Sequence, residues 1–112
     1  MMTGKGIMDF YNGDKYTGEF LNSAITGYGC YITHEGTKLI GYFDDGVCNK
    51  HGKKIYPDGT TYLGEFKKDI EHGKGVLTLK NGHNIRGIWS EGKLTQELIQ
   101  SLVTYDNSAA LA

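Results

Sequence analysis

The chain has 112 residues, a net charge of −1, and 17 glycines against one proline. Its length corresponds to a single domain, and no apolar run approaches the ~20 residues that cross a bilayer as a helix. The composition excludes collagen and argues against a nucleic-acid partner, and the two cysteines favour a reducing, cytoplasmic environment.

Glycine recurs with a period of 23 residues from residue 4 to residue 92, and all the glycines fall into five phases of that period. Aromatic residues keep the same period. Chance placement does not produce this pattern, so we predict a repeat array over residues 1–94. The expected units are a partial copy over 4–13, copies over 16–36, 39–59 and 62–82, and a partial copy over 85–94.

Each period is predicted to form two strands. Short runs such as residues 7–11 and 62–66 are rich in aromatic and branched residues, which favour strands. The turn glycine follows Asn, Asp or Glu in every copy, and Asn-Gly or Asp-Gly pairs suit tight hairpins. A second link, over residues 20–29 and its equivalents, is expected to be longer.

The sequence therefore predicts a mostly β fold: an elongated, single-layer antiparallel meander of eight strands, with contacts only between neighbouring repeats. Alternation along the strands puts Tyr16, Gly18 and Phe20 on one face. A glycine such as Gly64 weakens a strand, so its recurrence predicts that an aromatic ring lies across it.

The unit Tyr-x-Gly-x-Phe, a loop, Gly-x-Gly, a short strand and x-Gly resembles the MORN (membrane occupation and recognition nexus) repeat. Residues 62–82 carry the clearest copy, whereas the copy over 39–59 has Leu39 for the tyrosine and Lys50 for a glycine. The resemblance covers about residues 4–92. It implies an interaction or lipid-contact surface, as in the MORN arrays of cytoskeletal scaffolds, junctional membrane proteins and lipid kinases.

The pattern changes after Gly92. Apolar residues between 94 and 103 recur at the spacing of one helical face, and Thr95 is an acceptable N-cap. We predict a C-terminal capping α-helix over residues 95–105 and a tail over 106–112. The helix would either cover the last hairpin or bind a partner.

No residue set predicts a catalytic, cofactor or metal site. Residues 87–93 match the start of a phosphate-binding P-loop, but Leu94 stands where Ser or Thr must hold magnesium. The four histidines share no phase of the period and, with the cysteines, show no zinc spacing. The sequence therefore predicts a protein that is not an enzyme.

Lysine is concentrated between residues 50 and 80. Lys50 displaces a repeat glycine, and Lys54 falls on the face assigned to the aromatic residues. These lysines either form a solvated face or contact anionic headgroups or an acidic partner. The residues of that second hypothesis are Lys50, Lys53, Lys54, Lys67 and Lys68.

We expect a non-enzymatic interaction or scaffold module, cytoskeletal or membrane-associated, because a single-layer sheet cannot bury both faces by itself. Its partner would be another protein or a second copy of the chain. The predicted partner-binding face consists of Tyr16, Phe20, Tyr31, Phe43, Tyr62, Phe66 and Trp89. The alternatives are a monomer whose rings bury one another, a peripheral module that binds phospholipid headgroups, and a regulatory array of a larger enzyme.

Overall fold

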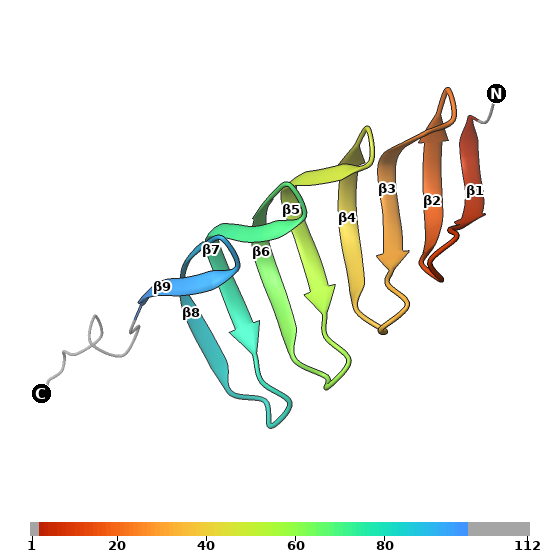
Figure 1. The fold of residues 1–112 in the computed structure, drawn as a ribbon. Coiled ribbons are helices and arrows are strands. Elements are labelled where there is room, and N and C mark those ends of the chain that lie inside the picture. The colour runs from red at the N-terminus through yellow and green to blue at the C-terminus, as the bar shows by residue number, and fades with distance from the viewer. Residues whose placement is uncertain (1–2, 99–112) are drawn as a thin grey trace, which may run out of the picture.

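The computed structural model describes residues 3–98, which form one antiparallel sheet of nine strands in chain order (Figure 1). The strands are β1 (Gly4–Asp9), β2 (Lys15–Leu21), β3 (Ala24–Ile32), β4 (Lys38–Asp44), β5 (Val47–Ile55), β6 (Thr61–Lys67), β7 (Ile70–Thr78), β8 (Asn84–Ser90) and β9 (Lys93–Glu97). Every strand pairs with its sequence neighbours, so the predicted meander is confirmed. It has one strand more than the eight expected, and the described residues contain no helix.

The turns at one end of the hairpins carry the predicted glycines. Gly59 has a φ of +95°, and its N–H donates to the carbonyl of Tyr56 at 3.0 Å. Gly36 bonds Thr33 in the same way, one repeat earlier. Only glycine adopts this backbone conformation without strain, which explains the phase of this series.

The turns at the other end are shorter than predicted. The chain turns between β2 and β3 at Asn22 and Ser23, whose φ angles are 50° and 67°. Two successive positive φ values are typical of a two-residue type I′ turn, whose twist matches that of the strands. The expected long link over residues 20–29 is therefore wrong, because most of those residues belong to β3.

An irregularity in the strand pairing lies just before each of these turns. The register between β2 and β3 shifts between Gly18 and Phe20, and the Glu19 carboxylate accepts the N–H of Tyr28 at 2.7 Å. Between β6 and β7, Glu65 accepts the N–H of Lys74 at the same distance. These carboxylates satisfy backbone donors that the bulge leaves outside the ladder.

The core lies on one face of the sheet and is built from the repeated aromatic residues. Tyr62 is fully buried, and its ring makes edge contacts with Phe66 and Trp89 at centroid distances of 5.2 and 5.0 Å. A β-carbon on Gly64 or Gly75 would collide with the Tyr62 side chain. The prediction that rings lie across the strand glycines is confirmed.

The end of the array differs from the prediction. Residues 95–97 belong to β9, in which Leu94 pairs with Trp89 and the Thr95 hydroxyl donates to the carbonyl of Ile88 at 2.9 Å. A helix that begins at Thr95 is therefore wrong, since the free edge of β8 supplies hydrogen-bond partners to the returning chain. The rest of the predicted helix and the tail lie outside the described residues.

Candidate functional site

The face predicted to bind a partner is the hydrophobic core. Tyr16, Phe20, Phe43, Tyr62, Phe66 and Trp89 are all buried, and Tyr31 is half-buried against them. Their proposed role as an exposed aromatic patch is therefore wrong. The strand glycines leave room for rings to lie flat on the sheet and cover one another, which was the alternative left open by the sequence.

The five lysines predicted to form a basic site do not share one surface. Lys54 lies on the core face, with its ammonium 3.5 Å from Glu71 and 5.3 Å from the centre of the Tyr56 ring. Lys53 points to the opposite face, beside Leu63 on the next strand. Lys67 ends β6, and Lys68 belongs to the following turn.

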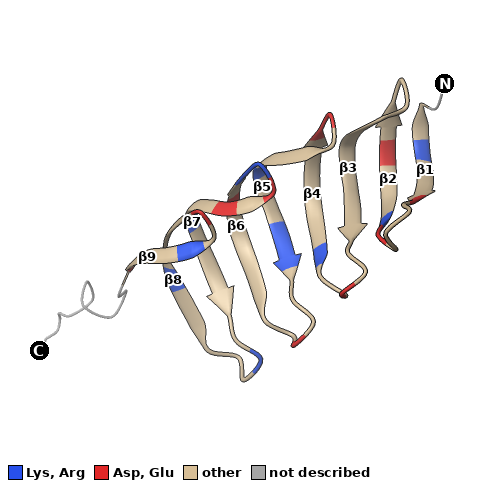
Figure 2. Cartoon of the chain, viewed as in Figure 1, with Lys and Arg blue, Asp and Glu red and all other residues tan. Residues whose placement is uncertain are grey.

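Lys50 is held by an aromatic contact of its own. Its ammonium lies 5.1 Å from the centre of the Tyr42 ring, and it lines a surface hollow together with Lys67 and His72. The distribution of charged residues along the strands is visible in Figure 2. The structure thus brings Lys50 and Lys67 to one hollow and separates Lys54 from them.

A polar cluster that the sequence did not predict surrounds Glu71 on the core face. Glu71 is 4% exposed. One of its carboxylate oxygens faces Lys54, and the other accepts a hydrogen bond from the Tyr56 hydroxyl. Repeat positions equivalent to Glu71 hold Ile25, Cys48 and Leu94. A glutamate at a position that is otherwise apolar is the sequence signal from which this polar cluster could have been predicted.

A second polar cluster closes the first hairpins. Asp14 is buried and accepts hydrogen bonds from the Tyr31 hydroxyl at 2.6 Å and the backbone N–H of His34 at 2.8 Å. These bonds, with that from Tyr31 the largest contribution, lower the pKa of Asp14 to about 2. Burial, assisted by the bond to Asp14, raises the pKa of Tyr31 to about 12. The pair fixes the β1–β2 turn to β3.

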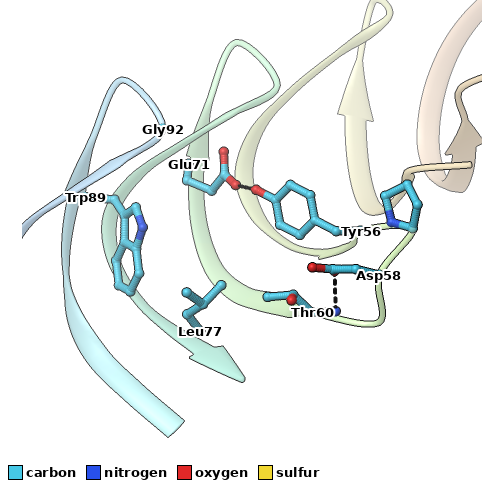
Figure 3. Close-up of a pocket in the computed structure, with 8 residues that line it drawn as sticks. Tyr56, Asp58, Thr60, Glu71, Leu77, Trp89 and Gly92 are labelled. Carbon is cyan, nitrogen blue, oxygen red and sulfur yellow. Dashed lines mark hydrogen bonds between the residues drawn. The ribbon is translucent and has the colours of Figure 1, made fainter. Parts of the chain in front are cut away.

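An open cavity of about 480 Å³ lies on the core face near its C-terminal end, between the β5–β6 turn and strands β7 and β8 (Figure 3). Its lining residues are Tyr56, Pro57, Asp58, Thr60, Glu71, Leu77, Trp89 and Gly92. Figure 3 shows the Tyr56 hydroxyl directed at Glu71 and the Trp89 indole forming the opposite wall. The cavity thus combines apolar walls with a buried carboxylate.

The opposite side of the sheet, which we call the open face, has no second layer among the described residues. Strand register places on it exposed apolar side chains, among them Ile7, Tyr28, Ile40 and Leu63, the last 59% exposed. Charged side chains from the same strands lie among them. The basic ones are Lys5, Lys15, Lys38, Lys53, Lys67, Lys74, Arg86 and Lys93, and the acidic ones are Asp9, Glu19, Asp44 and Glu65.

A family model described as the MORN repeat matches residues 1–15, 16–38, 40–61 and 62–84, about three quarters of the chain. The chain belongs to the MORN repeat family. The MORN units coincide with the hairpins, since units two to four each begin at or beside the core position held by Tyr16, Leu39 and Tyr62. None of the curated proteins compared with the chain is significantly similar to it.

MORN repeats are known interaction modules. The described part of this MORN array shows little sign of other kinds of site. Across residues 3–98, no three His, Cys, Asp or Glu side chains are placed to hold a metal ion. Cys30 and Cys48 are free, and burial raises the pKa of both thiols, which makes them poor nucleophiles. The described part of the chain holds no helix long and apolar enough to span a membrane.

Proposed function

We propose that this chain is a non-enzymatic interaction module that binds a protein partner across its open face. One observation carries the proposal: side chains such as Ile40 and Leu63 are exposed on a sheet face that no other layer formed by residues 3–98 covers. Contiguous exposed apolar side chains rimmed by polar ones are typical of interfaces. Because the aromatic residues are occupied in the core, the open face replaces them as the docking surface.

The charge of the open face indicates the chemistry of the partner. Basic side chains outnumber acidic ones on the described strands of this face, although the whole chain has a net charge of −1. Lys53 lies between Ile40 and Leu63, so apolar and basic side chains alternate across the open face. Such a surface is complementary to one with apolar side chains and carboxylates. Face-to-face pairing of two copies would juxtapose like charges, so the proposed partner is a different, acidic protein.

Crosslinking tests which face meets the partner. A photocrosslinking amino acid at position 63, on the open face, is expected to capture a protein that the same group at Tyr11 does not capture. Tyr11 is fully exposed but lies in the β1–β2 turn. The captured protein is then purified, and its affinity for the wild-type chain is compared with that for the double variant Ile40→Glu, Leu63→Glu.

The proposal expects at least a tenfold loss of affinity in the double variant and little change in Tyr11→Glu. Equal affinity of all three chains would overturn it. Vesicles of phosphatidylcholine and phosphatidylserine form a separate arm. Salt-sensitive co-sedimentation that depends on Lys50, Lys53 and Lys67 would instead support the headgroup-binding alternative.

A further inference from the structure

We propose that the cavity beside Trp89 is a second binding site, independent of the open face, which takes a lysine or arginine side chain of a polypeptide ligand. The Glu71 carboxylate would receive the cationic group, and the Trp89 indole would supply a ring wall and a hydrogen-bond donor. Three observations carry this assignment, and the first two lie at positions where the chain departs from its own repeat.

The first observation is the indole N–H of Trp89. Trp89 is only 5% exposed, and its indole nitrogen lies on the cavity side of the ring in Figure 3. No side chain or backbone group of residues 3–98 accepts a hydrogen bond from it. The equivalent residues Phe20, Phe43 and Phe66 have no such donor. A buried donor without an acceptor is unfavourable, so a ligand carbonyl that accepts from it would be bound preferentially.

The second observation is the incomplete pairing of Glu71. Its oxygen is 3.5 Å from the Lys54 ammonium, well beyond the 2.7–2.9 Å typical of a charge-assisted hydrogen bond. The other oxygen accepts the Tyr56 hydroxyl. The carboxylate is thus buried and oriented, with capacity for one further donor.

The third observation is the charge and shape of the cavity wall. The Asp58 carboxyl also lines the cavity, and the backbone N–H of Thr60, which donates to it at 2.9 Å, is the main reason that its pKa is below the usual value. The lining thus contains two carboxylates and no basic side chain, while Lys54 and Lys80 lie near these carboxylates without lining the cavity. Pro57 and Leu77 provide apolar walls.

These features together select a long cationic side chain. Its aliphatic stem would lie along the apolar walls, its charged end would reach the carboxylate, and the indole face would add a cation–π contact. The carbonyl of the same ligand residue would accept from the indole N–H. A free amine lacks that carbonyl, which separates a polypeptide ligand from a small cation.

The test uses the indole N–H of Trp89, which gives a single resonance because the chain has one tryptophan. The ¹⁵N-labelled protein is titrated with acetyl-Gly-Arg-Gly-amide, with the matched citrulline peptide, and with methylguanidinium. We expect a saturable downfield shift with the arginine peptide and at least tenfold weaker binding of the other two. No saturable shift, or equal binding of the arginine and citrulline peptides, would overturn the proposal. Methylguanidinium binding as tightly as the arginine peptide would overturn the polypeptide assignment.

Two variants separate binding from a structural role. Lys54→Met introduces the residue found at the equivalent Met8 and releases Glu71 from its competitor, so the arginine peptide should bind several-fold more tightly. Glu71→Gln should weaken binding at least tenfold. Loss of a merely structural ion pair would move the affinity in the same direction in both variants, and that result would contradict the assignment. Ile40→Glu, on the open face, should leave the titration unchanged.

Discussion

The ring of Tyr62 lies across Gly75 on the neighbouring strand, so closely that a β-carbon there would collide with the ring. The Tyr62 hydroxyl passes beyond the glycine and donates to the carbonyl of Glu65 at 2.9 Å. Tyr16 forms the same arrangement with Gly29 and the carbonyl of Glu19. The large and the small residue are thus one packing unit, in which each fixes the place of the other.

Substitution of that glycine tests the packing unit. Gly75→Ala is expected to cost about 1–3 kcal/mol in the free energy of unfolding, because the methyl group overpacks the ring. In a Tyr62→Leu background the same substitution should cost less than half as much, since leucine already occupies the equivalent position, Leu39. Urea titration of the four chains measures both values. Additive effects would show that the ring and the glycine do not interact.

Truncation of an aromatic residue tests the assignment of these rings to the core. Phe43 is buried and contacts the Tyr16 ring edge-on at 5.5 Å, so Phe43→Ala is expected to cost roughly 3–5 kcal/mol. Tyr28→Ala removes a ring of similar size that is 68% exposed, and it should cost no more than about 1 kcal/mol. Thermal and urea unfolding provide the measurement. A similar loss of unfolding free energy in the two variants would show that Phe43 is not a core residue.

The ion pair of Lys54 and Glu71 is expected to contribute little net stability. Lys54→Leu alone leaves the buried carboxylate of Glu71 without its cation and should cost about 3 kcal/mol. The double variant Lys54→Leu, Glu71→Ile restores the apolar pattern of Leu77 and Ile25, and it should be as stable as the wild type or more stable. A double variant less stable than the single one would contradict this expectation.

Asp14 should make stability dependent on pH in acid. Its pKa falls from 3.8 to about 2 on folding, so its charged form stabilises the native state fully above about pH 4. That contribution is lost as the pH falls from about 4 towards 2. Melting temperatures of the wild type and Asp14→Asn should therefore differ most near pH 6 and converge near pH 2. A constant difference across this range would contradict the assignment.

The glycine period was sufficient to predict the hairpins, because positive φ angles and ring contacts restrict these positions to glycine. Whether the aromatic residues are buried or exposed was not predictable from the same pattern. Alternation places Tyr16 and Phe20 on one face, but only the three-dimensional packing shows that Phe43 covers Tyr16. Periodicity assigns a face and does not say how far its side chains cover one another.

The end of the array shows a conflict between local and tertiary preferences. The apolar spacing after Leu94 suits a helix, yet the residues up to Glu97 pair with β8. Strand pairing with a preformed edge outweighs a short helical pattern, which is marginal on its own. The cavity was missed for a different reason: Glu71 and Trp89 are 18 residues apart in sequence, and only the register between β7 and β8 brings them to one cavity.

Every described strand is hydrogen-bonded only to the strands before and after it, and side-chain contacts such as that of Tyr62 with Trp89 reach one strand further, in a body of 62 × 25 × 22 Å. The nine described strands therefore follow one another in space in the order of the chain, and none of them closes the sheet into a barrel. If a force pulled the two ends of the described chain apart, the pairings between neighbouring strands would break one after another, and the hairpins would separate in sequence. Each step would release one 23-residue unit and leave the strand pairing of the remaining units in place.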